Sequence, residues 1–385
     1  MTFELKYPPR RLINAESRRS DLGGATLPPE VREAMLDAGC GPVDMYDMLE
    51  GANKELAELT GNEAAHVVPG AAAGLALATL AAMAEGDPAK TWQLRRPLDE
   101  HQLPSQVVVQ ASHLSPYGAA SELVGAKLRI VGNRDETPTE EFEAALGPQT
   151  AAVLFVPARD LPFETLSLAE VVARASTHAV PVIVDAAAQL PPVDNLSRFT
   201  TNLGADIAVF SGGKDLAGPG ASGLIVGKQQ WIECCRSLMY PHHHLARSFK
   251  VSKEEVAGLV AAVRRYVAMD HDARRSDLER ICATWLSHID GLPGITATRQ
   301  FPNEAGQELP RVRIELDASQ FAVGALEIRQ RLRQRDPAIA VSANETNSLF
   351  ITPETLAAGE DRLVIDALES ELGSARREAG REVVP

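Results

Sequence analysis

Short apolar runs alternate with segments of helical spacing along most of this chain. Residues 181–184 (PVIV) and 207–210 (IAVF) contain no polar side chain. Runs this continuous are typical of strands in a parallel sheet that is covered on both faces. Further strands are predicted over residues 66–68, 106–110, 125–132, 151–156 and 224–226.

Segments of helical spacing fall between these strands. Residues 44–60 and 168–177 repeat apolar side chains every three or four positions. The alternation of strands and helices predicts an α/β fold with a parallel sheet and right-handed crossovers. Other helices are predicted over residues 29–36, 71–84, 139–146 and 228–240.

The pattern changes after about residue 270. Residues 311–316 (RVRIEL) alternate between polar and apolar side chains, as a half-exposed strand does. We therefore expect a second, smaller lobe, and a disordered charged tail from residue 374 onward. Its other elements are predicted as helices over residues 277–289, 325–335 and 363–372 and strands over 338–341 and 348–351.

Composition narrows the class of protein. The 385 residues are 45% hydrophobic and 23% charged, with no apolar run of transmembrane length. The first residues, MTFELKYPPRR, lack the apolar core of a signal peptide, and the four cysteines do not form a disulfide framework. These features predict a cytoplasmic protein. The formal net charge of -14 argues against a broad nucleic-acid surface.

One lysine stands out between two apolar runs. Residues 204–227 read GADIAVFSGGKDLAGPGASGLIVG, so Lys214 follows a predicted strand on a glycine-rich loop. A lysine whose pKa is lowered by burial or by a neighbouring cation becomes a nucleophile that can form a Schiff base with an aldehyde. Taken alone, this segment fits a solvated lysine in a turn equally well.

A carboxylate changes that balance. Asp185 ends the apolar run 181–184, and open α/β sheets bind their ligands at the carboxyl ends of strands. Pyridoxal phosphate needs a lysine for its aldehyde and a carboxylate that keeps its ring nitrogen protonated. Asp185 and Lys214 supply both, although Asp185 alone would also serve as a helix N-cap.

A third segment predicts an anion site. After the strand at residues 66–68, Pro69-Gly70 opens a helix of small residues. Free backbone amides and the helix dipole converge at such a start, so the amides near Gly70, Ala71 and Ala72 are candidates to bind a phosphate. The alternative is a close-packed alanine-rich core helix.

These motifs resemble a known family. SGGKDLAGPGASG (residues 211–223) is similar to the lysine motif of the SelA-like group of fold-type-I pyridoxal-phosphate enzymes, and LTGNEAAHVVPGAAAGLALA (residues 59–78) to its phosphate-binding segment. The group includes L-seryl-tRNA(Sec) selenium transferase and D-glucosaminate-6-phosphate ammonia-lyase relatives. The resemblance extends from about residue 12 to about residue 372.

The resemblance implies a fold and domain limits. We expect a large domain with a mostly parallel sheet of the seven-stranded type between helices, and a small α+β C-terminal domain. Residues 1–45 would form an N-terminal segment at the small lobe and the active-site mouth, residues 46–245 the cofactor-binding domain, and residues 246–385 the bridging helix and small domain. Active sites of this fold form at a dimer interface, so a homodimer or higher homo-oligomer is expected.

The resemblance also implies roles for site residues. Lys214 would hold pyridoxal 5'-phosphate and then act as the base at Cα, while Asp185 would protonate the ring nitrogen. His113 would pack on one face of the ring and Ala187 on the other. The remaining contacts are predicted as Ser211 with the phosphate and Gln189 with the ring hydroxyl.

Basic residues are candidates for the substrate. Arg247 and Lys250 match basic positions of the family, and Arg311 or Arg313 could bind a substrate carboxylate through a bidentate contact. Arg18 is a further candidate, because the family pattern has a glycine just after Asn-Ala where this chain reads ESRR (residues 16–19). No metal site is predicted, because the run at residues 242–244 (HHH) points its side chains in different directions.

The expected reaction is removal of the Cα proton from an amino acid or amino-sugar acid. Loss of a β-hydroxyl would follow, giving a 2-oxo acid and ammonia, as in a lyase. A transferase, racemase or β-replacement enzyme is the alternative, and a non-catalytic protein of the same fold is the second. A tRNA substrate is expected less, because the family segment begins within the first 25 residues and leaves no room for an N-terminal tRNA-binding domain.

Overall fold

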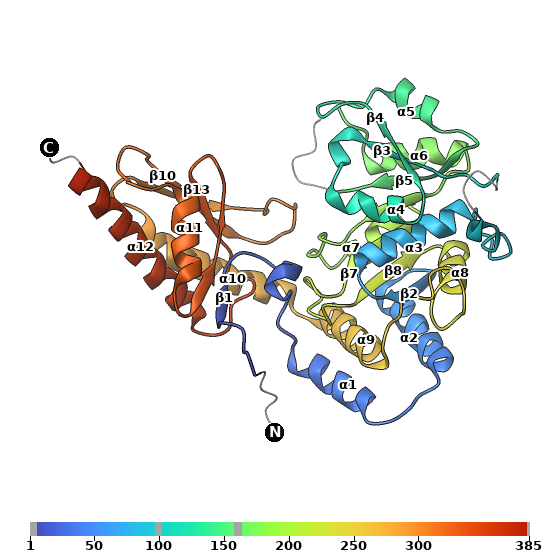
Figure 1. Ribbon diagram of the computed structural model, residues 1–385, viewed down its shortest axis with the longest axis horizontal. Helices are drawn as coiled ribbons and strands as arrows, with labels where there is room; N and C mark the ends of the chain where they lie inside the picture. The colour runs from blue at the N-terminus through green and yellow to red at the C-terminus, as the bar shows by residue number, and fades with distance from the viewer. Residues whose placement is uncertain (1–5, 97–101, 158–163, 383–385) are drawn as a thin grey trace. The chain divides into compact units, whose positions relative to one another are not determined.

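Two compact units make up the structure, a computed structural model that describes residues 6–96, 102–157 and 164–382. The larger unit consists of Gly23–Met269 with Glu304–Gln307 (Figure 1). The smaller unit consists of Met1–Leu22, Asp270–Asn303 and Glu308–Pro385. The chain thus passes into the smaller unit after Met269, near residue 270, where the second lobe is predicted to begin; the predicted range 246–385 also includes the bridging helix that precedes this lobe.

A seven-stranded sheet forms the centre of the larger unit, in the order β2-β8-β7-β6-β5-β3-β4. Strand β8 is antiparallel to both of its neighbours, and the other strands share one direction. The predicted α/β fold with a mostly parallel sheet is confirmed. The strands are β2 (Ala64–Val68), β3 (Gln106–Gln110), β4 (Lys127–Val131), β5 (Thr150–Phe155), β6 (Val182–Asp185), β7 (Ile207–Ser211) and β8 (Gly223–Gly227).

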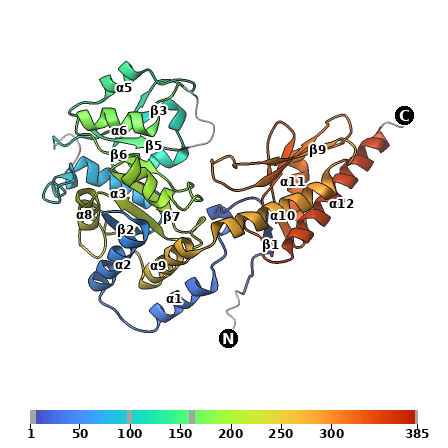
Figure 2. The ribbon, with the colours of Figure 1, turned by 180° about the vertical axis from the view of Figure 1, so that it is seen from behind.

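Helices cover both faces of this sheet (Figures 1 and 2). Apolar side chains of α2 (Met45–Thr60), α5 (Thr139–Ala145), α6 (Leu168–Thr177) and α9 (Lys253–Ala268) pack on one face. Those of α3 (Ala71–Met83), α4 (Ala119–Leu123) and α8 (Gln229–Leu238) pack on the other. The unit also contains α1 (Pro29–Gly39), α7 (Asn195–Ser197), a π-helical turn (Arg198–Asn202) and short 3-10 turns at Gln93–Arg95, Ala111–His113 and Pro116–Gly118.

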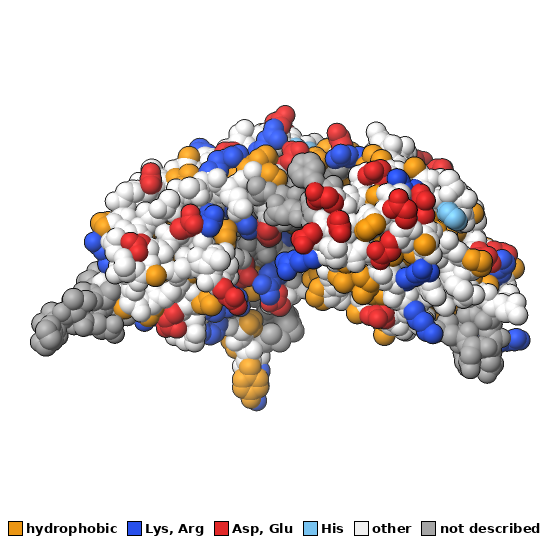
Figure 3. Space-filling model, turned by 90° about the horizontal axis from the view of Figure 1, so that it is seen from above, with side chains coloured by type: hydrophobic (Ala, Val, Ile, Leu, Met, Phe, Trp, Pro, Cys, Tyr) orange, Lys and Arg blue, Asp and Glu red, His pale blue; other side chains and the backbone are white. Residues whose placement is uncertain are grey.

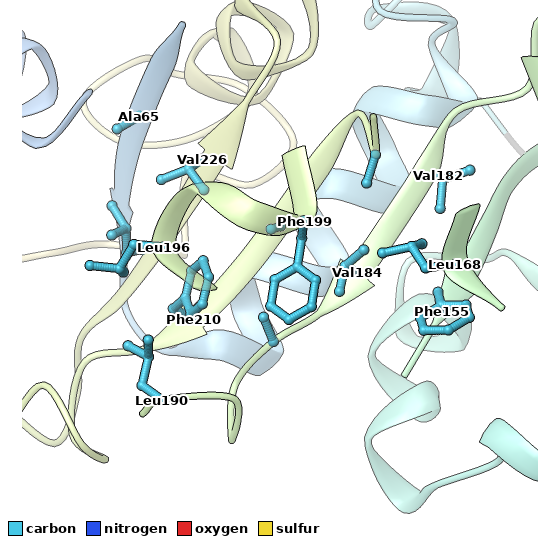
Figure 4. Close-up of a cluster of buried hydrophobic side chains, with 14 of the residues drawn as sticks. Ala65, Phe155, Leu168, Val182, Val184, Leu190, Leu196, Phe199, Phe210 and Val226 are labelled. Carbon is cyan, nitrogen blue, oxygen red and sulfur yellow. The ribbon is translucent and has the colours of Figure 1, made fainter. Parts of the chain in front are cut away.

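The central strands are buried because both of their faces are apolar. Val184 and Phe210 point into one core, and their neighbours Ile183 and Val209 point into the other. Figure 4 shows Phe199 beside Phe210 in the first core, with ring centroids 6.4 Å apart. The strands that end at Asp185 and Ser211 are therefore fixed along their length.

Several helix starts follow from local sequence. Ser167 and Glu170 form a reciprocal capping box at α6, and Ser252 and Glu255 form another at α9. Asp44 caps α2 by accepting from two backbone amides. Such caps satisfy the amide groups that a helix start leaves without partners, so local sequence determines where these helices begin.

The smaller unit has an antiparallel sheet in the order β12-β13-β10-β9. Strand β1 (Leu12–Asn14) pairs in parallel with β11 (Ala338–Ala340), which attaches the N-terminal segment to this unit. The other elements are β9 (Ile295–Gln300), β10 (Arg311–Leu316), β12 (Ser342–Ala343), β13 (Ser348–Ile351), α10 (His271–Ile289), α11 (Ala325–Gln334), α12 (Glu360–Glu382) and a 3-10 turn at Ser20–Leu22.

Some element predictions are wrong in detail. Helix α12 runs to Glu382, so the disordered tail predicted from residue 374 is a helix; the sequence SARREAGRE consists mainly of strong helix formers. The predicted strand 338–341 is confirmed as β11 and ends one residue early, at Ala340, whereas β9 and β12 were not predicted. Within the described residues, no helix is long and apolar enough to cross a membrane.

Candidate active site

The topology gathers the predicted site residues of the larger unit at one edge of the sheet. Asp185 ends β6, Ser211 ends β7, and Lys214 lies on the loop that follows. His113 follows β3, and Gly70 follows β2, which runs in the same direction as β7. The carboxyl ends of these strands therefore face the same side, as ligand sites of α/β sheets do.

Lys214 and Asp185 act on each other electrostatically. Burial lowers the pKa of the Lys214 amine, and the Asp185 carboxylate opposes that shift. Burial raises the pKa of Asp185, which is only 8% exposed, while the amide of Ala187 and the charge of Lys214 lower it. Burial thus increases the neutral, nucleophilic fraction of the amine, and the buried carboxylate would gain from a cationic partner.

His113 is a buried neutral imidazole. Its ring meets Phe155 edge to face, with centroids 4.4 Å apart, and its Nδ1 accepts from the amide of Val156 at 3.4 Å. Burial lowers its pKa to about 4. Its Nε2 and the Oγ of Ser112 are buried without a hydrogen-bond partner among the described residues. Buried polar atoms without partners are rare, so this edge is suited to a polar ligand.

An anion cradle lies at the start of α3. Gly70 has φ of 126°, and the first intrahelical hydrogen bond ends on its carbonyl. The amides of Ala71 and Ala72 therefore lack partners inside the helix. Gly223 pairs with Ser211 across the sheet, and a Cβ on Gly223 would lie 2.7 Å from the carbonyl carbon of Gly70. The cradle thus depends on a missing side chain.

Ala187 and Gln189 lie on the turn after β6. The amide of Ala187 donates to Asp185 Oδ1 at 3.1 Å. Gln189 Nε2 donates to the carbonyls of Pro157, at 2.9 Å, and Ala305, at 3.2 Å. The Nε2 of Gln189 is thereby committed to backbone contacts. The contact of Gln189 with the ring hydroxyl stays a prediction, as do the roles of the other site residues.

Arg247 lies in the loop between α8 and α9. Its guanidinium carbon is 4.7 Å from the ring centroid of Tyr240, and Lys250 Nζ is 5.7 Å from the same centroid. The Nε of Arg247 is buried without a hydrogen-bond partner among the described residues. Tyr240 thus brings two basic side chains together, and their contact with a phosphate or a substrate stays a prediction.

Arg311 is a buried residue of the smaller unit. It is 8% exposed, its Nε donates to Gln300 Oε1 at 2.7 Å, and its guanidinium carbon lies 4.4 Å from the ring centroid of Phe350. These contacts hold the guanidinium in one orientation within its own sheet.

The other two candidate substrate-binding arginines of the smaller unit are in ion pairs. Arg313 pairs with Glu315 at 2.7 Å, and Arg18 pairs with Glu354 at 3.0 Å. Arg18, Arg311 and Arg313 all belong to the smaller unit, and their contact with a substrate carboxylate stays a prediction. No group of three or more potential metal ligands occurs in the part of the chain that the structure describes.

Three residues near Lys214 gain importance from the structure. The ring centroid of Tyr117 lies 6.0 Å from Lys214 Nζ. Tyr266 Oη donates to Asp215 Oδ2 at 2.6 Å. Asp215 directly follows Lys214 in the chain. Tyr117 lies four residues after the candidate His113, which is the sequence signal for it; nothing in the sequence connects Tyr266 to the lysine loop.

A mostly parallel seven-stranded sheet that presents a buried lysine and a carboxylate at its carboxyl edge defines a fold-type-I pyridoxal-phosphate enzyme. Comparison with known proteins agrees with this class. The family profile of L-seryl-tRNA selenium transferase (SelA) matches residues 120–330. The chain belongs to this family.

Individual relatives cover nearly the whole chain. A 5'-C-glycyluridine monooxygenase-decarboxylase from a Streptomyces species is 33% identical over 93% of this chain and 89% of its own length. A D-glucosaminate-6-phosphate ammonia lyase from Salmonella typhimurium is 28% identical over 93% of this chain and 95% of its own length. A solved structure of a D-glucosaminate-6-phosphate ammonia-lyase superposes with a TM-score of 0.79 at 27% identity, covering 95% of this chain and 97% of that chain. The protein is a pyridoxal-phosphate-dependent enzyme.

Proposed function

We propose that the protein is a lyase that acts on an amino acid or amino-sugar acid with a β-hydroxyl group and releases a 2-oxo acid and ammonia. The observation that carries this proposal is the Lys214 amine, whose pKa burial lowers, in electrostatic contact with the buried Asp185 carboxylate. The ammonia-lyase relative, which is similar over 93% of this chain, supports the reaction class.

The residues of the larger unit fit pyridoxal phosphate. The buried Asp185 carboxylate would hold the ring nitrogen, and the cradle formed by Gly70, Ala71, Ala72 and Ser211 would hold the phosphate. The unpartnered Nε2 of His113 supports a ligand over this edge. When bound, the cofactor supplies an aldehyde for the lysine and an electron-withdrawing ring that acidifies Cα.

Lys214 would remove the Cα proton of the bound substrate. Burial lowers the pKa of this amine, so a larger fraction is neutral and able to accept a proton near pH 7. The β-hydroxyl then leaves with a proton as water, which creates a carbon–carbon double bond. Addition of water to the resulting unsaturated amine releases ammonia and the 2-oxo acid, so hydrogen and oxygen balance.

A second candidate is decarboxylation. The Streptomyces relative with decarboxylase in its name is 33% identical, against 28% for the ammonia lyase. In that case the carboxylate leaves Cα as carbon dioxide, and Lys214 would return a proton to Cα. The family profile is that of a transferase, which supports replacement at the β-carbon as an alternative. Such a replacement would begin, like the lyase reaction, with removal of the Cα proton.

Product analysis separates these reactions. Holoenzyme is incubated with β-hydroxy amino acids and 2-amino-2-deoxy aldonic acids carrying a labelled carboxyl carbon. Ammonia and a labelled 2-oxo acid in equal amounts support the lyase, whereas labelled carbon dioxide supports the decarboxylase. Lys214→Ala should abolish either product and the cofactor adduct that borohydride fixes on Lys214. Absence of any Lys214 adduct in the wild type would contradict both candidates.

We also propose a cytoplasmic homodimer or higher homo-oligomer with a small-molecule substrate and no nucleic-acid partner. All four cysteines are free thiols, three of them buried, which suits a reducing compartment. The net charge is -14, and on the face in Figure 3 acidic side chains are interspersed among the basic ones. Light scattering of the holoenzyme tests the dimer, and a tRNA filter-binding assay at two salt concentrations tests the absence of nucleic-acid binding.

A further inference from the structure

Helix α9 packs directly against the loop that carries Lys214. A Cβ on Gly212 would lie 2.9 Å from Leu259 Cδ1, and a Cβ on Gly218 would lie 3.2 Å from Ala262 Cβ. Two glycines of the loop therefore allow close contact with this helix. Side chains three or four residues apart lie on the same helix face, so Leu259 and Ala262 form one supporting surface.

Tyr266 extends that surface by another turn and adds a polar contact. It lies four residues after Ala262 and is fully buried at 0% exposure. Its Oη donates to Asp215 Oδ2 at 2.6 Å, and Asp215 is 4% exposed. Hydrogen bonds from a hydroxyl to a carboxylate are short and about twice as strong as neutral ones. Asp215 is the neighbour of Lys214 in the chain.

We propose that Tyr266 is a positioning residue for Lys214, acting through its hydrogen bond to Asp215. The bond joins a rigid helix to the residue after the lysine, in a loop whose glycines would otherwise leave the backbone free to move. It keeps the Lys214 amine at its half-buried position facing Asp185. The catalytic meaning of this device rests on the proposed base role of Lys214, but the positioning itself is measurable without the cofactor.

The environment of the amine gives the readout. Among the described residues, the groups that face the Lys214 amine are the Asp185 carboxylate and the ring of Tyr117. Burial outweighs the attraction of Asp185, and the pKa of Lys214 is lowered. If the loop loosens, the amine gains solvent, and its pKa rises towards the ordinary value of 10.5.

The test compares cofactor-free wild type with Tyr266→Phe, which keeps the buried ring and removes the hydroxyl. The pKa of Lys214 is measured by competitive acylation with acetic anhydride from pH 7 to pH 11, read by mass spectrometry of the Lys214 peptide. A pKa rise of about one unit is expected, which is about tenfold less labelling at pH 8. In the holoenzyme kcat should fall about tenfold, with a smaller change in KM.

Matched variants separate positioning from general loosening. Asp215→Asn retains an oxygen that accepts from Tyr266 and should keep the labelling curve of the wild type, whereas Asp215→Ala should repeat the shift of Tyr266→Phe. Val263→Ala removes apolar volume from a buried position of the same helix and should lower stability without moving the curve.

An unchanged Lys214 curve in Tyr266→Phe, or an equal shift in Val263→Ala, would overturn the proposal. The positioning role of Tyr266 and the proposed lyase function can be contradicted independently of each other. A shifted curve together with a wild type that releases neither a 2-oxo acid nor carbon dioxide would retain the positioning role and remove the proposed function.

Discussion

The two edges of the seven-stranded sheet differ in how their polar groups are satisfied. The amino edge contains a cavity of about 650 Å³ beside the starts of β5 and β6. The carboxylates that line it are in ion pairs. Asp206 accepts from Lys228 Nζ at 2.6 Å and from the amide of Val182 at 2.8 Å, and Glu85 pairs with Lys90. This edge therefore has a cavity, but the carboxylates that line it already have partners.

The carboxyl edge has the opposite character. Asp185 has a raised pKa, Lys214 a lowered one, and the Nε2 of His113 lacks a partner among the described residues. Each group would gain from a ligand, because burying polar groups without partners costs about 1–3 kcal/mol apiece. Buried polar groups with shifted pKa values or without hydrogen-bond partners thus indicate the position of the active site better than the size of a cavity does.

The largest expected effect comes from exchanging one carboxylate at each edge. Asp185→Ala should lower kcat by about 10²–10³-fold, because it removes the negative charge that would hold the protonated ring nitrogen of the cofactor during the reaction. The free energy of unfolding of the cofactor-free variant should equal or exceed that of the wild type, since burial already disfavours this charge. Steady-state kinetics and urea unfolding measure both quantities.

Asp206→Ala is the matched variant at the amino edge. It should leave kcat within about twofold and lower the free energy of unfolding by about 1–3 kcal/mol, because the amide of Val182 loses its acceptor. Equal losses of activity in the two variants would contradict the distinction between the edges.

A second prediction concerns the anion cradle. A Cβ on Gly223 would lie 2.7 Å from Gly70 and 3.0 Å from the Ala71 amide, both backbone contacts that cannot turn aside. Gly223→Ala should therefore weaken pyridoxal-phosphate binding by about tenfold or more and cost about 1–3 kcal/mol of stability. Titration of the cofactor-free protein measures the affinity. Gly220→Ala, where a Cβ meets nothing within 4 Å, is the control that should change neither quantity.

Much of this edge was predictable from sequence because continuous apolar runs identify buried strands. The runs at 181–184 and 207–210 correspond to β6 and β7, and they place Asp185 and Lys214 after parallel strands. A run such as 224–226 carries no information on direction, so the antiparallel course of β8 was not predictable. The bond between Asp215 and Tyr266 joins residues 51 apart, and Tyr266 looks like an ordinary core residue of an amphipathic helix.

Acid should destabilise the protein through two buried histidines. Burial lowers the pKa of His66 to about 3 and that of His113 to about 4, from an ordinary 6.5. Above pH 6.5 neither state is protonated. Between pH 6.5 and the lowered pKa of the folded state, each histidine is protonated in the unfolded chain but not in the folded chain. Protonation therefore stabilises the unfolded state, and the free energy of unfolding falls as the pH decreases. At pH 5 the loss is about 2 kcal/mol for each histidine.

Urea unfolding at pH 7.5 and pH 5 tests this prediction. His66 lies on β2, is hydrogen-bonded to Asn53 at 3.0 Å and is not among the predicted cofactor contacts. His66→Leu should lower stability at pH 7.5, because Asn53 loses its partner, and should reduce the pH-dependent loss by about 2 kcal/mol. An identical pH-dependent loss in this variant would assign the acid sensitivity to other groups.

The smallest effect is expected at Tyr117, whose ring lies over the Lys214 amine and is itself 61% exposed. An aromatic face stabilises a cation by about 0.5–1 kcal/mol at such exposed sites, so it raises the pKa of Lys214 slightly and opposes the effect of burial. Tyr117→Ala should lower that pKa by about 0.4–0.7 units, whereas Tyr117→Phe keeps the ring and should leave it unchanged. Competitive acylation of Lys214 in both cofactor-free variants measures the difference. A shift in Tyr117→Phe equal to that in Tyr117→Ala would assign the effect to the hydroxyl, and the ring would then contribute nothing to the contrast between the two edges.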